Sequence, residues 1–348
     1  MTTAKSRGGD PTGRALVIGG YGAVGSAVTA ALDAWFPGRA IPAGRNAAKA
    51  HRLDGVRTDI ADPDTFARTL DRLSDVTVVV LCAEPPDTTA AELCLERGIH
   101  IVDVGATAHL LDALTRLGPL ARRTGAAAVL STGVAPGLTN LLARRAHEAV
   151  GGADRIDLTL LLGTGDHHGA DAVRWTLTSL TAPVPAAPLR IGLPGYGTRT
   201  AHPFPFSDQY TLPRTLGVPR VTTRLCLDSR ALTAGLFALR DGPGRLAERP
   251  AVRRLLTGLL NRVHLGGEGF AVRADAHRHG RHAAYALTGN RQSRITGLVA
   301  AHAARAVLTS AVTPGVHHIE EVPALTGLPE DLSGHGIGLL RHTGGTTR

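Results

Sequence analysis

Three glycines directly after a short apolar run are the residues of this chain with the clearest chemistry. The stretch Val17-Ile18-Gly19-Gly20-Tyr21-Gly22-Ala23-Val24-Gly25 places Gly20, Gly22 and Gly25 in the spacing G-x-G-x-x-G. Glycine at these places permits a tight turn, lets the backbone approach a pyrophosphate, and allows a helix to pack closely on a strand. The free N–H groups at the start of that helix then face the anion. The pattern predicts a dinucleotide-binding turn, with a purely structural glycine turn as the alternative.

The end of the next apolar strand indicates which dinucleotide is bound. A fold that binds NAD usually has Asp or Glu about twenty residues further on, where it hydrogen-bonds the ribose 2′-hydroxyl. Here the strand ends in Ala43-Gly44-Arg45-Asn46, and no carboxylate occurs between residues 39 and 50. The guanidinium of Arg45 suits a 2′-phosphate, and Lys49 follows one helical turn later. We therefore expect NADP(H), with two solvated surface cations as the alternative.

Four residues are candidates for catalysis: Asp103, His167, His168 and Tyr210. Asp103 ends an apolar strand, where a carboxylate suits contact with an iminium or amine; a strand-end cap is the alternative. The Gly-flanked segment Asp166-His167-His168 could hold a proton donor, or form a solvated loop. No third ligand accompanies the two histidines, so we expect no metal site.

Two further segments could bind an anionic group. In Ser207-Asp208-Gln209-Tyr210, with Arg214 just after, a carboxylate could bind or Tyr210 could donate a proton; an ordinary polar loop is the alternative. In the run from Ser131 to Asn140, a strand leads through a Gly/Pro turn into a helix. The backbone amides of residues 137–139 could bind an anionic substrate group or the cofactor there.

Elements that would position these residues alternate between strand and helix in the first half of the chain, which is typical of a parallel sheet with crossover helices. Strands are expected over 15–19, 39–43, 56–59, 76–82, 99–104 and 127–130, and helices over 23–35, 63–73, 88–97 and a stretch reaching 123. Beyond residue 151, strands are expected over 155–162, 221–228, 270–276 and 283–288, and one long helix over 294–309 that packs back on the first domain. Residues 182–219 show no clear period.

Composition limits the class of protein. Hydrophobic residues make up 43% and charged residues 19% of 348 residues, and no apolar run reaches the roughly 18 residues of a membrane helix. The net charge of +9 is spread along the chain without a basic run, which disfavours nucleic-acid binding. Only two lysines occur, and no tyrosine begins a Tyr-x-x-x-Lys pair, so Schiff-base and short-chain dehydrogenase chemistry are not expected. Three scattered cysteines indicate reduced thiols, and we expect a cytoplasmic protein.

The chain resembles the saccharopine dehydrogenase (saccharopine reductase-like) family. The resemblance rests on the glycine turn, on Ala43-Gly44-Arg45-Asn46, on Cys94 to Asp103, and on Gly133-Val134-Ala135-Pro136-Gly137-Leu138-Thr139-Asn140. A weaker match covers Gly289 to Thr296 with Gly315-Val316. Coverage is good to residue 150 and loose afterwards.

This resemblance implies an α/β protein with a Rossmann-type parallel-sheet domain and an inserted α+β substrate domain, often dimeric through its second sheet. We expect a disordered tail over 1–14, the NADP-binding domain over 15–150 plus about 290–348, and the substrate domain over 151–289. The segments at Asp103 and at 133–140 would line the nicotinamide and substrate cleft. The expected cofactor-binding residues are Gly20, Tyr21, Gly22, Ala23, Val24, Gly25, Arg45, Asn46, Lys49, Asp59, Cys82, Ala83, Gly105, Gly133 and Pro136.

Members of this family catalyse NAD(P)-linked reactions on carbon–nitrogen bonds. We therefore expect an NADP(H)-dependent oxidoreductase that transfers hydride to or from the C=N or amine of a small amino-acid-like substrate, as a homodimer. Two alternatives stay open: an NADPH-dependent ketone or aldehyde reductase on the same scaffold, and a non-catalytic NADP-binding sensor. The substrate domain departs from the best-known members, so their substrates do not transfer to this chain.

Overall fold

The computed structural model describes residues 13–165, 175–176, 178–180, 182, 184–241 and 266–342. Its first sheet contains seven strands: β1 (Arg14–Ile18), β2 (Ala40–Gly44), β3 (Val56–Arg57), β4 (Val76–Leu81), β5 (His100–Asp103), β6 (Ala127–Leu130) and β13 (Gly315–His318). They are ordered β13-β6-β5-β4-β1-β2-β3, and every pair is parallel. The expected α/β class with a Rossmann-type sheet is confirmed.

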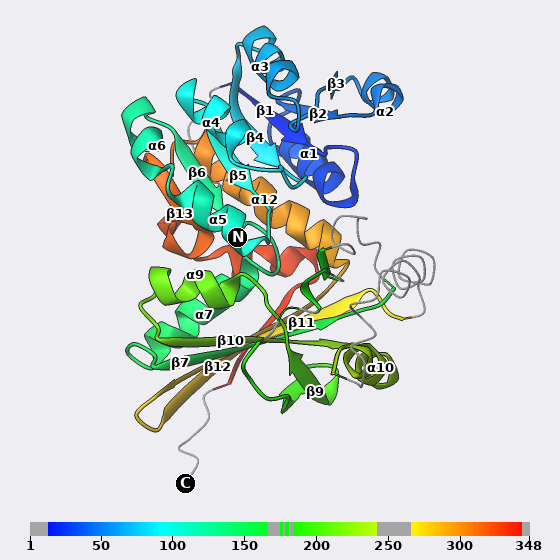
Figure 1. The fold of residues 1–348 in the computed structure, drawn as a ribbon, viewed down its shortest axis with the longest axis vertical. Coiled ribbons are helices and arrows are strands. Elements are labelled where there is room, and N and C mark those ends of the chain that lie inside the picture. The colour runs from blue at the N-terminus through cyan, green and yellow to red at the C-terminus, as the bar shows by residue number, and fades with distance from the viewer. Residues whose placement is uncertain are drawn as a thin grey trace, which may run out of the picture.

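Helices cover both faces of this sheet (Figure 1). They are α1 (Ala23–Trp35), α2 (Ala47–Arg52), α3 (Pro63–Arg72), α4 (Thr89–Glu96), α5 (Ala108–Thr115), α6 (Gly118–Thr124) and α12 (Gln292–Leu308). Successive side chains of a strand point to opposite faces, so Val78 and Val80 of β4 pack with α1 and α12, while Val79 packs on the α3–α4 side. No helix in the described ranges is long and apolar enough to cross a membrane.

The local sequence explains where several helices begin and end. Asp62 caps α3: its Oδ1 accepts the N–H of Thr65 at 3.1 Å, and Pro63 occupies the first helical position, where a missing N–H costs nothing. The helical stretch expected up to residue 123 consists of two helices, α5 and α6. Pro119 stands at the start of α6 and cannot continue the hydrogen-bond ladder of α5.

The second sheet has seven strands of mixed direction: β7 (Arg155–Leu162), β8 (Leu189–Leu193), β9 (Gly197–Pro203), β10 (Arg220–Leu227), β11 (Gly269–Arg278), β12 (Arg281–Asn290) and β14 (Gly338–His342). Their order is β14-β12-β11-β7-β10-β9-β8. Among the described residues it is accompanied by α7 (Leu138–Ala149), α9 (Asp208–Thr215) and α10 (Arg230–Asp241). Short helical turns follow β13: η2 (Ile319–Glu321), η3 (Pro323–Leu325), α13 (Leu328–Asp331) and η4 (Leu332–His335).

Two features of the second half have no counterpart among the elements expected from the sequence. Residues 338–342 form β14, which pairs with β12 of the second sheet. The segment 182–219, which shows no period in the sequence, contains β8, β9 and α9. β8 lies at the edge of the sheet, and only Leu193 of its five residues is buried.

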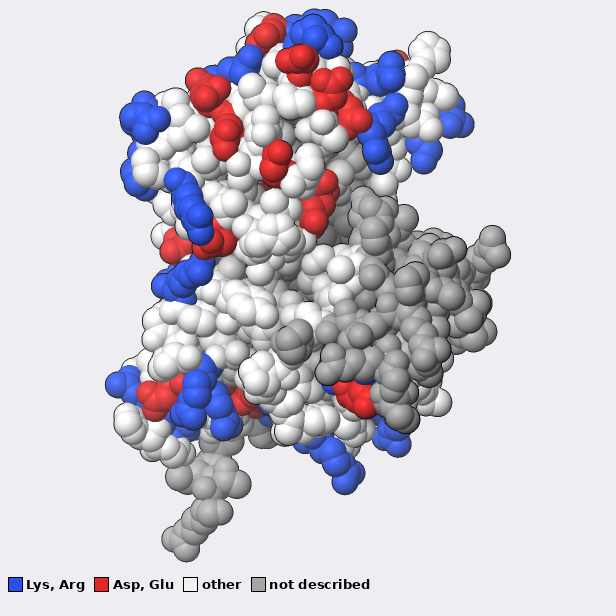
Figure 2. Space-filling view, in the orientation of Figure 1, with Lys and Arg blue, Asp and Glu red and all other residues white. Residues whose placement is uncertain are grey.

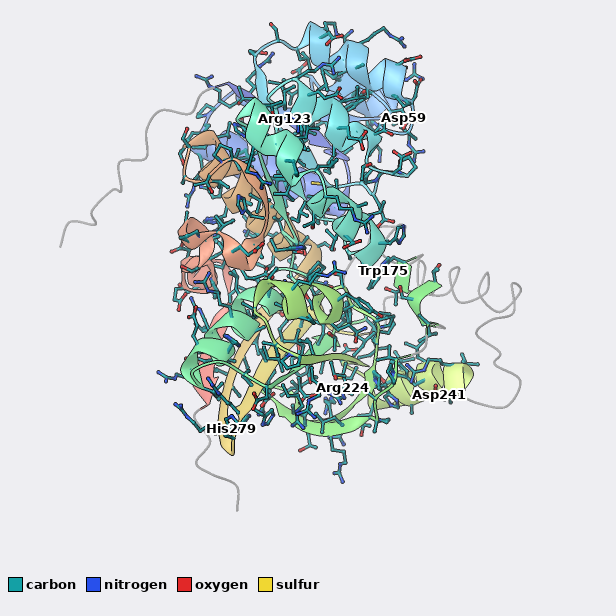
Figure 3. All side chains as sticks on the ribbon, turned by 60° about the vertical axis from the view of Figure 1, so that its left-hand side comes forward. Asp59, Arg123, Trp175, Arg224, Asp241 and His279 are labelled. Atoms are coloured by element: carbon teal, nitrogen blue, oxygen red, sulfur yellow. The ribbon has the colours of Figure 1, made fainter. Side chains whose placement is uncertain are left out.

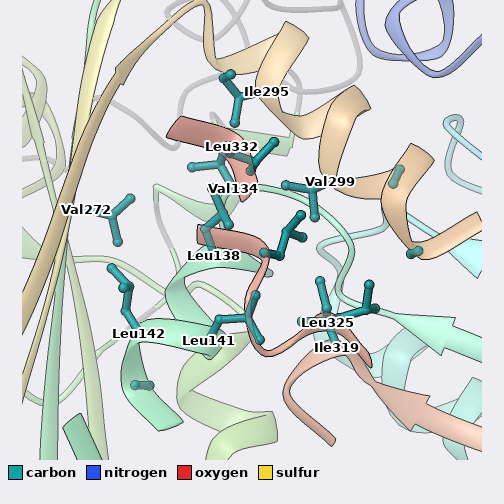
Figure 4. Packing of buried hydrophobic residues seen from close by; sticks show 14 of the residues in the cluster. Val134, Leu138, Leu141, Leu142, Val272, Ile295, Val299, Ile319, Leu325 and Leu332 are labelled. Carbon is teal, nitrogen blue, oxygen red and sulfur yellow. The ribbon is translucent and has the colours of Figure 1, made fainter. Parts of the chain in front are cut away.

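One continuous apolar cluster joins the two sheets (Figure 4). Leu141 and Leu142 on α7 pack in it together with Val272 of the second sheet, while Ile295 and Val299 on α12 reach it from the first sheet's side. The two layers therefore share a packed core, and the carboxyl ends of the parallel strands face the junction between them.

Candidate cofactor and active site

The glycine turn presents unpaired backbone donors at the carboxyl end of β1. The N–H of Gly20 donates to Ala43 O at 3.1 Å, and the N–H of Gly22 donates to Gly19 O at 2.8 Å, which closes the turn. Ser26 is the first residue to bond within α1, through Gly22 O at 2.9 Å. The N–H groups of residues 23–25 therefore precede the helical ladder, and within the described ranges no side chain caps this end of α1.

The space around each glycine tests whether the turn fits a dinucleotide. A Cβ atom on Gly25 would lie 2.2 Å from Gly19 O, and one on Gly20 would lie 2.8 Å from Pro42 Cα, so packing of the chain itself requires both glycines. A Cβ on Gly22 would meet only Gly19 O, at 3.3 Å, and Gly22 is exposed. The open space at Gly22, beside the free amides, is where a pyrophosphate would approach the backbone.

Tyr21 ties this turn to the neighbouring strands. Its hydroxyl oxygen lies 3.2 Å from the carbonyl oxygens of both Pro42 and Val56, which share its one donor hydrogen. A Cβ on Gly44 would lie 3.2 Å from the Tyr21 ring, and one on Gly55 would lie 2.8 Å from its hydroxyl oxygen. The phenol is thus held against β2 and β3, and its role is to position the turn relative to the residues that follow β2.

Replacement of Tyr21 by Phe should weaken NADPH and NADH binding together, by about three- to tenfold, because one hydrogen bond that fixes the turn is worth about 0.5–1.5 kcal/mol. Fluorescence titration of both cofactors measures the effect. Tyr285→Phe, on β12 of the second sheet, is the matched control. Unchanged affinity in the Tyr21 variant would show that the turn holds its position without this anchor.

Three cations gather where β2 and β3 end. Arg45 and Lys49 are exposed, and neither side chain forms an ion pair or hydrogen bond within the described ranges. Asn46 begins α2 by accepting the Lys49 N–H at 2.9 Å. Arg57, which the sequence did not reveal, is also exposed and lies opposite Gly44 in the β2–β3 pair. Basic side chains gather around α2 in Figure 2, so this corner suits a phosphate.

The remaining residues expected at the cofactor follow β3 and β4. Asp59 lies at the edge of the first sheet, where its Oδ1 accepts the N–H of Ala61 at 3.0 Å (Figure 3). Cys82 follows β4 and donates its N–H to Ile18 O at 3.0 Å, and a Cβ on Gly19 would lie 3.3 Å from Cys82 O. Cys82 and Ala83 therefore border the glycine turn. Loss of solvation raises the pKa of the Cys82 thiol, and the charge of Asp103 adds to this, so the thiol form is favoured at neutral pH.

Asp103 ends β5 and is buried, with 3% of its surface exposed. Its side chain borders a small cavity that Glu84 and Thr107 also line. Loss of solvation raises the pKa of Asp103 to about 7; the negative charge of Glu84 adds to this, and a hydrogen bond from the Gly105 N–H opposes it. A Cβ on Gly105 would lie 2.8 Å from Asp103 Oδ2, so a larger residue there would displace the carboxyl group.

The loop before α7 does not offer the anion-binding amides that the sequence suggested. The three N–H groups of residues 137–139 donate within the chain, to Asn140 Oδ1 at 3.0 Å and to the carbonyl oxygens of Gly133 at 2.9 Å and Val134 at 3.1 Å. The N–H of Gly133 donates to Pro136 O at 2.9 Å, and both residues are buried. The loop satisfies its own backbone groups, which corrects that expectation.

Asp103 and Tyr210 do not share a cavity. Tyr210 lies on α9, is 47% exposed, and lines a second cavity of about 380 Å³ between α5, α9 and β13. Leu111 and Leu114 of α5 face the Asp103 cavity, while Asp112 and Thr115 face the other. The helix therefore separates the two candidates. His167 and His168 lie outside the described residues, and within those residues no three His, Cys, Asp or Glu side chains form a group that could hold a metal.

Comparison with known proteins identifies the first domain. Residues 15–129 match the family model described as the saccharopine dehydrogenase NADP binding domain. Among solved structures, an engineered D-amino acid dehydrogenase bound to NADP+ is 18% identical, covers 92% of this chain and 98% of its own, and has a TM-score of 0.49. Dihydrodipicolinate reductase from Paenisporosarcina sp. TG-14, bound to dipicolinate, is 12% identical over 89% and 99% of the two chains, with a TM-score of 0.40.

Proposed function

Residues 15–129 belong to the saccharopine dehydrogenase NADP-binding domains, and the protein is an NADP-binding oxidoreductase of Rossmann type. From this premise we propose that it acts on the C=N or CH–NH group of a small amino-acid-like molecule. The observation that supports this substrate class is Asp103. Its carboxyl group ends a central strand at the edge of the sheet where dinucleotide folds place the reacting ring.

The chemistry of Asp103 suits a carbon–nitrogen bond. NADPH, when bound, supplies the hydride, and the chain must place the acceptor and manage one proton. With a pKa of about 7, Asp103 is part neutral acid and part carboxylate near neutral pH. The carboxylate form of Asp103 can stabilise a protonated imine, and the acid form can protonate a neutral imine. Asp103 can therefore assist hydride transfer whether the imine binds protonated or neutral.

The residues that would hold NADP(H) follow the carboxyl edge of the first sheet. We propose that the backbone of residues 22–25 binds the pyrophosphate and that Arg45, Lys49 and Arg57 surround the 2′-phosphate. Asp59 then borders the adenosine, and the β4 and β5 ends, at Cys82 and Asp103, border the nicotinamide half. This order matches the sheet order from β3 to β5.

An Asp103→Asn substitution should lower turnover of a discovered imine substrate by about a hundredfold or more, the usual contribution of a positioned acid or base. The amide keeps the size of the side chain but cannot titrate, so the ionisation near pH 7 should disappear from the kcat/KM profile. NADPH affinity, measured by fluorescence, should stay close to wild type. Asp87→Asn, which changes another carboxylate lining the same cavity, is the control.

The same substitution has a readout that needs no substrate. Folding raises the pKa of Asp103 from 3.8 to about 7, so the folded state binds this proton more tightly. The stability that it contributes is complete below about pH 4 and is lost as the pH rises through about 7. In Asp103→Asn that dependence should be absent from denaturation curves. An unchanged kcat/KM profile together with this lost stability dependence would make Asp103 only a strand-end cap.

A screen of NADPH consumption over cyclic imines, 2-oxo acids with ammonia, ketones and aldehydes tests the reaction class itself. Carbon–nitrogen substrates should be turned over fastest. Faster reduction of ketones or aldehydes without ammonia would replace the proposal by a carbonyl reductase. Tight NADPH binding with no turnover across the panel would favour a sensor.

We also propose a homodimer formed through the second sheet. β14 is an edge strand of that sheet, and its Leu340 is 50% exposed. An unpaired edge with an exposed apolar side chain is a surface on which a second copy can pair. Light scattering after size-exclusion chromatography should give twice the mass of the chain, and Leu340→Glu should shift the protein to the monomer. A wild-type monomer would contradict this.

A further inference from the structure

The cavity of about 380 Å³ beside Tyr210 has the features of a small-molecule site, and the proposed reaction does not use it. Its size lies in the range of about 300–1,000 Å³ that is usual for such sites. It opens at the waist of the molecule, where α5 and α9 approach each other and where acidic and basic side chains meet (Figure 2). The residues used below to argue for a ligand are Asp112, Thr211, Arg214, Thr215, His318 and Glu321, all of which line it.

An unsatisfied hydroxyl group lies in the wall of this cavity. Thr211 is only 5% exposed, and its Oγ1 has no hydrogen-bond partner among the described residues. One turn further along α9, the Thr215 hydroxyl donates to Glu320 Oε1 at 2.7 Å. A buried polar atom without a partner costs free energy, whereas a ligand in the cavity would supply one. Thr211 is therefore a ready contact for a bound molecule.

The buried groups behind this wall favour a positive charge. Asp208 and Glu320 are fully buried, and in the described part of the chain only neutral groups hydrogen-bond to their carboxylates: Thr139 to Asp208, and Asn140 and Thr215 to Glu320. Burial raises the pKa of both acids, that of Asp208 to about 7, with the charge of Glu320 contributing. A cation in the cavity would offset this cost.

The groups that line the cavity also favour a positive charge. Asp112 and Glu321 are acidic. Asp112 already pairs with two arginines, Arg214 of the lining and Arg116 at 2.6 Å, whereas Glu321 has no lysine or arginine partner in the described part of the chain. The imidazole of His318 is bonded to Ser131 Oγ at 2.8 Å, and burial lowers its pKa to about 4, so it is neutral and does not repel a cation. The charge of Asp112 is thus shared between two arginines, and Glu321 carries the negative charge at this cavity that no ion pair of the described residues offsets.

We propose that this cavity binds a small molecule through a protonated amino group. The ammonium N–H groups donate to Thr211 Oγ1 and face the carboxylate of Glu321, and Arg214 at the opening receives a carboxylate where the same molecule carries one. The site is separated by α5 from the cavity at Asp103, and it stands whether or not the reaction proposed above is correct.

Ethylammonium, glycine and acetate, each titrated into the wild-type protein and followed by saturation-transfer NMR, test the charge preference. Ligands of so few atoms bind in the millimolar range at best. Ethylammonium and glycine should saturate in that range, and acetate should not. Glycine binding more tightly than ethylammonium supports the role of Arg214. Acetate binding as tightly as ethylammonium, or no binding of either amine up to about 50 mM, overturns the proposal.

Two substitutions locate the binding. Thr211→Val removes the unpaired hydroxyl at constant shape, and Glu321→Gln removes an exposed charge while keeping an oxygen that can accept the His318 N–H. Each should weaken ethylammonium binding by about threefold or more. Glu330→Gln, an exposed acid paired with Arg145 elsewhere, should have no effect. Wild-type ethylammonium affinity in Glu321→Gln overturns the site even if Thr211→Val does not fold. NADPH affinity should be unchanged in all three variants, which separates this site from the cofactor site.

Discussion

Gly22→Val should abolish NADPH binding and leave the fold intact. Gly22 has φ −86° and ψ 174°, an extended conformation that valine adopts readily, and a Cβ there meets only Gly19 O at 3.3 Å. In the complex, however, the side chain would fill the space through which a pyrophosphate reaches the amides of residues 23–25. Loss of two charge-assisted hydrogen bonds, each worth about 1.5–3 kcal/mol, predicts a drop in affinity of about a hundredfold or more.

A neighbouring glycine provides the matched contrast. A Cβ on Gly25 would lie 2.2 Å from Gly19 O, so Gly25→Ala must displace the turn even without a ligand. Thermal denaturation should therefore show a lowered Tm for Gly25→Ala and a nearly unchanged Tm for Gly22→Val, while fluorescence titration shows lost NADPH binding in Gly22→Val. Wild-type affinity in a folded Gly22→Val protein would refute the cofactor site at this turn.

Arg45→Ala should convert cofactor preference with little change in stability. A 2′-phosphate carries close to two negative charges, and Arg45 is exposed without an acidic partner in the described chain, so its guanidinium is available. Loss of a bidentate charge-assisted pair costs about 1.5–3 kcal/mol, so NADPH should bind about ten- to a hundredfold more weakly. NADH, which lacks the phosphate, should bind almost as before, and the penalty for NADPH should shrink at high salt.

Arg52→Ala is the control for this result, because Arg52 is an exposed arginine at the end of α2, the helix that follows Arg45, and its Nε donates to Ala48 O at 3.3 Å. Arg57→Ala should give a smaller loss in the same direction if Arg57 shares the phosphate. A wild-type protein that prefers NADH, or an Arg45 variant that loses both cofactors equally, would remove Arg45 as the phosphate ligand.

Local chemistry in the sequence determined most of the first domain. The β1 strand, the glycine turn and α1 follow from an apolar run, three glycines and a helical pattern that lie next to one another in the chain. The cap at Asp62 and Pro63 and the uninterrupted apolar run of β4 are equally local. Arg45 was identifiable because its distance from the glycines is fixed by one helix and one strand, and these have standard lengths.

The tertiary structure alone decided what depends on partners far apart in the chain. Arg57 joins Arg45 and Lys49 only through the pairing of β3 with β2. The amides of residues 137–139 have partners close in the chain, at Gly133, Val134 and Asn140, but only the folded conformation of the loop shows that these amides are occupied. β14 finds its place through pairing with β12, which no local pattern encodes. The pKa of Asp103 near 7 also depends on the tertiary structure, because α5 and the segment after β4 exclude water from its carboxyl group. The sequence identifies the aspartate, but only the fold determines how well it is solvated.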